Sequence, residues 1–229
     1  MPRIKSSLVD DVFNLIVERI NHYTYITGDA ISEASLAEEL NISRTPVREA
    51  ILKHIEVGLL WKDKSKVIVK PFNLYDIKEI LDARLGIELM SVRIITERGG
   101  LNEQDLAKFE DFYNMFSKSI NDNNNIDKFF TYDTIFHKMI VDFSQNSRLI
   151  EFSNRLNIQS QRFKKITILT PGRHKIADKE HQEIFYAFKE NNAQKLNEVL
   201  TYHIENSKKN YEEILTNDTW SKMIKTLRV

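Results

Sequence analysis

Three histidines and one aspartate in the second half of the sequence carry side chains suited to holding a metal ion. Asp133 and His137 are four residues apart in an expected helix, so both project from one face. His181 and His203 lie on apolar stripes of two later expected helices. Imidazole nitrogen and carboxylate oxygen suit Zn²⁺, with Ni²⁺ or Mn²⁺ as alternatives. If the three helices meet, the four side chains can share one divalent cation.

Simpler explanations exist for each of these residues. A single histidine on an apolar stripe is more often an ordinary core residue than a ligand. Asp133 and His137 could form a hydrogen-bonded pair within their helix. Spacing along the chain does not establish that three helices meet, so both interpretations stay open at this stage.

Arg84 is the candidate clamp for a small ligand. Its guanidinium can pair in a bidentate way with an organic acid. Glu88 lies four residues on, along the same expected helical face. An internal Arg84–Glu88 ion pair therefore explains the pattern at least as well.

A second group of functional residues lies at the start of an expected short helix near the N-terminus. Arg44 and Arg48 can pair in a bidentate way with guanine O6 and N7. The hydroxyls of Ser43 and Thr45, with the open N–H groups of a helix start, can bind phosphate. This combination of side chains favours contact with a DNA major groove.

The charge around that helix supports the same interpretation. The whole chain has 33 basic and 33 acidic side chains, but residues 44–70 contain seven basic and three acidic ones, a local charge of +4. Lys64 and Lys66 lie near the expected tip of a hairpin, where we expect them to contact phosphate. An ordinary solvated surface would also carry lysines and arginines. The charge alone therefore does not distinguish an ordinary surface from a DNA-binding one. A local basic patch in a neutral chain is nevertheless the pattern expected of a protein that binds the DNA backbone.

The elements that position these residues form a small head. Apolar residues three and four apart predict a helix from Leu8 to Tyr23. A short helix over Glu33–Leu40 follows, and after a tight link a third begins behind Ser43 and ends at Gly58. Residues 59–72 then predict two short strands around a polar tip. Two short helices followed by a hairpin outline a winged helix-turn-helix.

The rest of the sequence predicts an all-helical body. We expect six amphipathic helices, with a polar connector over residues 121–125 and the chain divided into 1–72 and 73–229. The fold class is therefore mainly α, an N-terminal winged helix-turn-helix plus a C-terminal all-α helical bundle. The expected body helices are Leu74–Gly99, Glu103–Ile120, Ile126–Phe143, Arg148–Leu169, Ala177–Glu190 and Ala193–Leu215.

Composition excludes several other classes of protein. The chain has no cysteine, so disulfide scaffolds, thiolate metal sites and cysteine nucleophiles are excluded. It has six glycines and four prolines in 229 residues, too few for a turn-rich β-sandwich or barrel. No apolar run reaches the roughly 18–20 residues that span a bilayer, and the N-terminus lacks the apolar stretch of a signal peptide. We therefore expect a cytoplasmic protein with no membrane partner.

The head resembles a known family of regulators. The run Ser43-Arg44-Thr45-Pro46-Val47-Arg48-Glu49-Ala50-Ile51 is similar to the winged-helix head of the GntR family of bacterial transcription regulators, and the resemblance covers about residues 8–72. It implies that Ser43, Arg44, Thr45 and Arg48 contact an operator. The chain departs from the family at the wing tip, where Asp63 to Lys66 contain no glycine.

The body resembles the FCD effector domain of the FadR branch of the same family. Three short elements agree with that domain's motifs in order and separation over residues 74–215. They are Asp133-Thr134-Ile135-Phe136-His137, Glu180-His181 and Tyr202-His203. The resemblance implies that Asp133, His137, His181 and His203 bind a cation and leave positions for water or a carboxylate.

The function that we expect is a ligand-responsive transcription regulator and not an enzyme. A homodimer would bind a two-fold, double-stranded DNA operator, and a small organic acid would bind at the metal and Arg84 as effector. Two alternatives stay open: a metalloenzyme with an accessory head, and a metal-independent interaction module.

Overall fold

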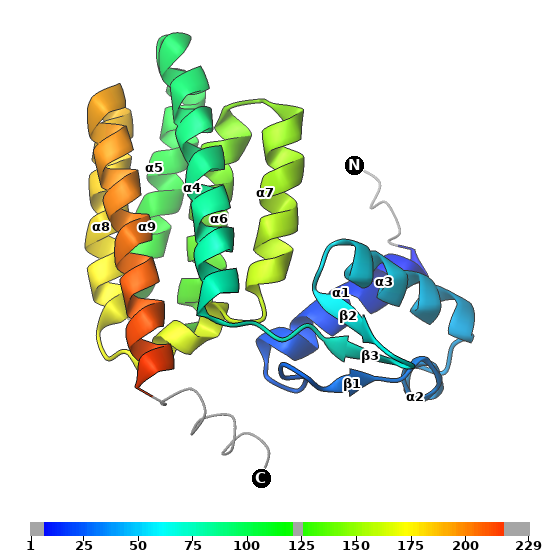
Figure 1. The fold of residues 1–229 in the computed structure, drawn as a ribbon. Coiled ribbons are helices and arrows are strands. Elements are labelled where there is room, and N and C mark those ends of the chain that lie inside the picture. Colours follow the sequence, from blue (N-terminus) through cyan, green and yellow to red (C-terminus); the bar gives the residue numbers. More distant parts are fainter. Residues whose placement is uncertain (1–6, 121–125, 218–229) are drawn as a thin grey trace.

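A computed structural model describes residues 7–120 and 126–217, and the expected connector at 121–125 lies outside this range. The described residues contain nine α-helices, one 3₁₀ helix and a three-stranded sheet. A small head of three helices and the sheet lies beside the lower end of a larger helical body (Figure 1). The predicted mainly α fold class is confirmed.

The three head helices begin where the sequence pattern indicates, and they end within two residues of the expected positions. They are α1 (Leu8–Asn21), α2 (Glu33–Glu39) and α3 (Arg44–Glu56). The side chain of Ser32 accepts a hydrogen bond from the Ser35 backbone N–H and so caps α2. Between α2 and α3, Asn41 has a φ of +52°, a left-handed conformation that asparagine adopts more readily than most residues. This tight link sets the angle between the two helices.

The sheet has one strand more than the sequence pattern predicted. Strands β2 (Leu60–Asp63) and β3 (Lys66–Val69) form the expected antiparallel hairpin, in which Asp63 pairs with Lys66. The additional strand, β1 (Ala30–Ile31), pairs with the other edge of β3 and gives the order β1-β3-β2. A strand of two residues is too short to show an alternating pattern, so only pairing in the folded chain reveals it.

One apolar cluster holds the head together. It joins the inner faces of α1, α2 and α3 to the sheet, and Ile16, Val47 and Leu59 in it have no exposed surface. Ile158 of the body also packs against this cluster. Burial of one such aliphatic side chain contributes roughly 1.5–3 kcal/mol to the stability of the fold. The cluster therefore holds α3 in a fixed orientation within the head.

The body is built from six long helices and one short 3₁₀ helix. Asn73 caps the first of them reciprocally with Asp76. Two of the predicted ranges agree with the structure at both ends, and two others differ by only one or two residues. The helices are α4 (Leu74–Glu97), α5 (Glu103–Ile120), α6 (Ile126–Phe143), α7 (Ser147–Ser160), the 3₁₀ helix η1 (Lys164–Leu169), α8 (Arg173–Lys189) and α9 (Ala193–Thr216).

The single helix predicted over residues 148–169 is wrong. The chain leaves α7 after Ser160, turns, and continues as the 3₁₀ helix η1. The stretch from Ile166 to Ile168 is β-branched, which lowers its helix propensity. Gly172, at a φ of +77°, is the N-cap of α8. The helix therefore begins at Arg173, four residues before the predicted Ala177. This break determines where Lys164 and Arg173 point.

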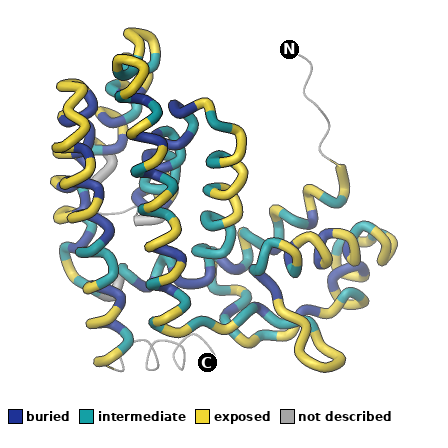
Figure 2. The backbone as a smooth tube through the Cα atoms, turned by 45° about the horizontal axis from the view of Figure 1, so that its top comes forward, coloured by how far each residue is buried: buried dark blue, intermediate teal, exposed yellow. Residues whose placement is uncertain are grey.

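Apart from α7, whose residues are intermediate or exposed, the body helices have buried inner faces and exposed outer faces (Figure 2). Aromatic rings fill much of this interior. Phe109 of α5 lies 5.0 Å from Phe136 of α6 and 5.5 Å from Phe185 of α8, measured between ring centroids. This packing brings α6 and α8, which carry three of the four expected metal ligands, to fixed positions. None of the helices among the described residues has the length and apolar character needed to span a bilayer.

Candidate metal centre and nucleic-acid interface

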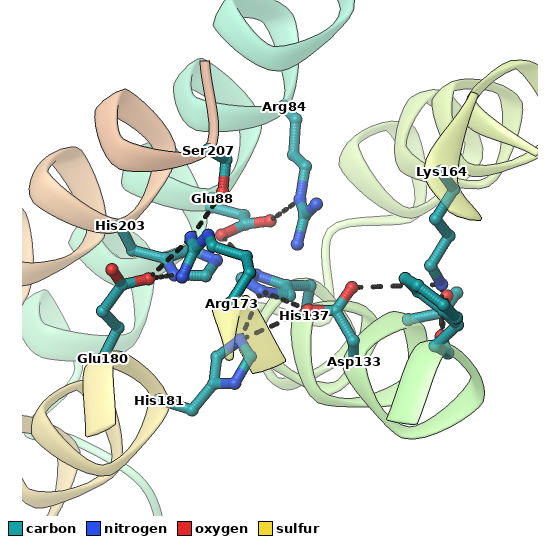
Figure 3. A network of polar contacts seen from close by, with 12 residues as sticks. Arg84, Glu88, Asp133, His137, Lys164, Arg173, Glu180, His181, His203 and Ser207 are labelled. Carbon is teal, nitrogen blue, oxygen red and sulfur yellow. Dashed lines mark hydrogen bonds and ion pairs between the residues drawn. The ribbon is translucent and has the colours of Figure 1, made fainter. Parts of the chain in front are cut away.

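The four side chains proposed as metal ligands come together inside the body (Figure 3). Asp133 and His137 project from α6, His181 from α8 and His203 from α9, and one potential ligand atom from each lies within 4.8 Å of all the others. The three histidines are buried, and the Asp133 side chain is 16% exposed. The convergence that spacing alone could not establish is therefore present.

The shorter distances fit a shared ion. His137 Nε2 lies 3.1 Å from His181 Nε2, and His181 Nε2 lies 3.4 Å from Asp133 Oδ1. Two neighbouring ligands at about 2.1 Å from one metal are about 3.0–3.4 Å apart. His137 Nε2 and Asp133 Oδ1 are 3.8 Å apart, so a small side-chain adjustment would complete the set.

Two buried carboxylates orient the imidazoles. His137 Nδ1 lies 3.0 Å from Glu88 Oε2, and His203 Nδ1 lies 2.7 Å from Glu180 Oε2. A carboxylate on Nδ1 favours a proton there and leaves Nε2 as the metal-binding atom, which is the usual arrangement behind ligating histidines. Sequence reasoning gave neither acid this role. Glu180 was visible next to His181, and Glu88 only as a partner of Arg84.

The protonation states also suit a cation site. Burial lowers the pKa of His137, His181 and His203, so the neutral imidazole predominates at neutral pH. Burial opposes ionisation of the Glu88 carboxyl, but hydrogen bonds from His137 and Arg84, together with the positive charge of Arg84, outweigh it and lower its pKa to about 2. Asp133 stays ionised, with its pKa well below the usual value, because contacts with His181, His137 and Lys164 outweigh its burial.

Arg84 makes the internal ion pair that was considered for it, and it also faces the cavity where a ligand clamp would have to lie. Its Nε donates to Glu88 Oε1 at 2.7 Å, so the internal ion pair is present. It also lines a cavity of about 70 Å³ beside Asp133 and His203, and its buried Nη2 has no hydrogen-bond partner. The guanidinium therefore keeps one donor available while its other end is fixed by Glu88.

Two further cations line the same cavity and were missed from the sequence. Arg173 donates to Glu180 Oε2 at 3.0 Å, and its Nη1 is buried without a partner. Lys164 Nζ lies 3.9 Å from Asp133 Oδ2, and burial lowers its pKa to about 8 although Asp133 opposes this. No pattern in the sequence could have placed these two side chains at the cavity, because their directions depend on the break between α7 and α8.

In the head, the predicted DNA-contacting residues lie at the exposed start of α3. Ser43 occupies the N-cap position, but its side chain makes no capping hydrogen bond. Arg44 and Thr45 are exposed in the next turn. Arg48 is also exposed and pairs with Glu33 of α2, with 3.0 Å between its Nη2 and Glu33 Oε2. Phosphate or a base edge would have to compete with that surface ion pair.

The wing carries the other two predicted contacts. Lys64 and Lys66 are exposed at the two-residue turn between β2 and β3. Lys64 has a φ of +54°, so this lysine adopts the left-handed conformation that usually favours glycine. The wing therefore turns tightly without a glycine at its tip.

Comparison with known proteins gives the family. Residues 8–60 match the family model described as bacterial regulatory proteins, gntR family, and residues 79–206 match the FCD domain model. The HTH-type transcriptional regulator YdhC of Bacillus subtilis (strain 168) is 23% identical over 204 residues, covering 89% of this chain and 90% of that protein. The Nta operon transcriptional regulator of Aminobacter aminovorans is 28% identical over 133 residues, 56% of this chain and 60% of that protein.

Solved structures share the fold. McbR/YncC of E. coli superposes with a TM-score of 0.78 at 20% identity, covering 91% of this chain and 98% of that one. A GntR regulator from Rhodococcus sp. RHA1 gives a TM-score of 0.72 at 19% identity, covering 91% and 99%. The matched family model is described as bacterial regulatory proteins and the curated relatives are named transcriptional regulators, so the metalloenzyme alternative is rejected. The chain belongs to the GntR family of bacterial transcription regulators and carries an FCD effector domain.

Proposed function

We propose that this regulator binds a two-fold DNA operator as a homodimer and responds to a small organic acid held at a metal ion in its body. We place the boundary between the two domains after Phe72, giving 1–72 for the DNA-binding domain and 73–229 for the effector, metal-binding and dimerisation domain. Helix-turn-helix dimers match the two-fold symmetry of their operators, and pairing two half-sites multiplies the affinity of one head.

DNA binding is assigned to Ser43, Arg44, Thr45 and Arg48 of α3. What supports this is their exposure at the N-terminal end of a helix that projects from a rigid apolar core. Lys64 and Lys66 of the wing would add phosphate contacts. Arginine would read guanine, and the hydroxyls and lysines would fix the register on the backbone.

The metal is assigned to Asp133, His137, His181 and His203. The single observation that carries this assignment is the convergence of one carboxylate and three neutral imidazoles, with Glu88 and Glu180 behind two of them. Three nitrogen ligands and one oxygen ligand suit Zn²⁺, and Ni²⁺ or Mn²⁺ would also accept this set. Such an ion supplies positive charge and an open position for a carboxylate oxygen.

The effector is assigned to the cavity beside this centre. Arg84 offers a buried donor there without a partner, and so does Arg173. A small acid with oxygen groups at both ends could use the two guanidiniums and still fit a cavity of about 70 Å³. The wall also offers hydroxyl and amide groups for orienting it, from Thr134, Asn157, Ser160, Thr167, Ser207 and Tyr211.

The test combines DNA selection with metal analysis. Protein purified without a histidine tag should select a two-fold site from random DNA at moderate salt, and it should contain about one divalent ion per chain. Arg44→Ala with Arg48→Ala should abolish the selection and leave the metal in place. His137→Ala should lose the metal and leave DNA binding largely intact. Full selection by the double variant, or stoichiometric metal in His137→Ala, would refute the corresponding assignment.

A further inference from the structure

The end of α7 and the start of η1 face two functional regions at once. Asn157, Ser160 and Lys164 line the effector cavity. On its other side, the same stretch contacts the head and the linker through Arg155, Ile158, Gln159 and Arg162. In Figure 1, α7 is the body helix next to the head. About ten consecutive residues therefore separate the cavity from the DNA-binding domain.

The first contact holds the C-terminal end of the recognition helix α3. Arg155 Nη2 donates to the backbone oxygen of Glu56 at 3.0 Å, and Gln159 Nε2 donates to that of Val57 at 2.8 Å. The last carbonyls of a helix lack partners within it, and a cation there also suits the helix dipole. At Gly58 a β-carbon would lie 3.2 Å from Gln159 Nε2, so the approach is close. Two side chains of the body thus cap the helix that reads DNA.

The second contact holds the linker. Arg162 is buried, and its Nη1 donates to the backbone oxygens of Lys70 and Pro71 at 3.2 and 3.1 Å. The neighbouring Phe163 ring lies 5.6 Å from the ring of Phe72 and 5.5 Å from that of Tyr211, which lines the effector cavity. The linker therefore packs directly on a residue of the cavity wall.

The segment also contacts the proposed metal site. Lys164 Nζ lies 3.9 Å from Asp133 Oδ2 and donates to the backbone oxygen of Phe130. These contacts tie the start of η1 to α6. A divalent cation on Asp133 would repel the ammonium group of Lys164 in a poorly solvated site, where such interactions are strong. Occupancy of the centre would thereby change how firmly η1 is held against α6.

We propose that the segment from Arg155 to Lys164 carries occupancy of the metal and effector site to the recognition helix, with Arg155, Gln159 and Arg162 as positioning residues for α3. The inference rests on the proposed function, because it requires the metal to bind at Asp133. A ligand shifts an equilibrium only by binding two arrangements with different affinity. Here the arrangements differ in how α7 and η1 hold the end of α3 and the linker.

Amide hydrogen exchange of the full chain, with and without Zn²⁺ alone, provides the test. A typical coupling of 1–3 kcal/mol corresponds to a change of about 5- to 150-fold. In the wild type, we therefore expect Zn²⁺ to change exchange at the amides of Val57, Gly58 and Leu59 by at least about fivefold. The variant Arg155→Ala with Gln159→Ala should retain Zn²⁺-dependent protection around Asp133 but lose the change in the head. Arg148→Ala, an exposed arginine near the other end of α7, is the matched control and should behave as the wild type.

The outcomes separate the inference from the proposed function. A head response that persists at full size in the double variant overturns the inference, and so does protection of the body with no response of the wild-type head. Zn²⁺ that leaves exchange around Asp133, His137 and His181 unchanged would instead overturn the metal site itself. Loss of the head response in the double variant alone supports the proposed route.

Discussion

The head and the body use charged side chains in opposite ways. In the head, Arg44, Lys64 and Lys66 are exposed, and their potential partner is a large polyanion that brings its own charge. In the body, Asp133, Glu88 and Glu180 lie among buried imidazoles and guanidiniums, and each is held by hydrogen bonds or ion pairs. Exposed charge needs no partner in the free protein, whereas buried charge is costly without one.

This difference explains what each region can recognise. A solvated basic surface can slide along DNA and adjust to it, and its contacts are individually weak. A buried network has little freedom, so the effector that we propose would be selected by the few donors left without partners, here Arg84 Nη2 and Arg173 Nη1. The contrast predicts that substitutions in the body act in larger, more specific steps than those in the head.

The largest effect is expected for His137→Ala. It removes one of the four proposed metal ligands and also leaves the buried Glu88 carboxylate without its imidazole partner. Loss of a partner behind a metal ligand typically costs 10–100-fold in affinity, so loss of the ligand itself should exceed about 100-fold. Competition with a chelator measures this affinity. His174→Ala removes a histidine outside the cluster and should leave the metal affinity unchanged. An equal loss of metal affinity in both variants would contradict the assignment of His137 as a ligand.

The next effect concerns an imidazole buried in the head. His54 has no exposed surface, stacks on Phe13 at 3.8 Å between centroids, and burial lowers its pKa to about 4. Its unfolded pKa is about 6.5, so the unfolded chain binds the proton first as the pH falls. Head stability that is fully present above pH 6.5 should therefore decrease down to about pH 4, by up to ~3 kcal/mol from this group.

Hydrogen exchange of the α1 and α3 amides, analysed as opening free energies between pH 7 and pH 4, measures that loss. His54→Leu removes the titrating group at similar volume. Its head should lose less stability than the wild type over the same range, because the buried imidazole of His54 no longer contributes to the pH dependence. Parallel losses in both proteins would show that His54 does not cause the pH dependence.

A smaller effect is expected for Arg44→Ala in the head. The Arg44 side chain is exposed and has no hydrogen bond or ion pair with any other residue in the described part of the chain, so its loss should barely affect folding. One bidentate arginine–guanine contact contributes about 1–3 kcal/mol, so affinity for a selected operator should fall about 5- to 150-fold. Fluorescence anisotropy measures it. Arg93→Ala in the body, another exposed arginine, is the control, and operator affinity equal to the wild type in both variants would contradict the role of Arg44.

The smallest effect is expected for Lys66→Gln in the wing. A phosphate contact carries no sequence information, so binding should weaken by a similar factor on selected and unrelated DNA. The slope of log affinity against log salt should become shallower by about one unit. Lys175→Gln, an exposed lysine of the body, should leave the slope unchanged. A sequence-dependent loss for Lys66→Gln would instead indicate base contact by the wing.

The sequence predicted much of the fold because most elements are indicated by patterns of neighbouring residues. Three- and four-residue apolar spacing located α1, α5 and α6, and Ser43 marks where α3 begins. It did not predict β1, whose two residues have no pattern of their own. It also did not predict the break after Ser160, because apolar periodicity continues through it.

For the candidate site, the sequence by itself determined which residues could act: the arginines behind Ser43, and an aspartate and three histidines on apolar stripes. These are properties of local composition and helical spacing. Only the tertiary structure decided that α6, α8 and α9 bring the four ligands within reach of one another, that Glu88 and Glu180 stand behind two of them, and that Lys164 and Arg173 enter the cavity. The physical reason is that helical spacing gives the direction of a side chain around its own axis, whereas distances between helices depend on long-range packing.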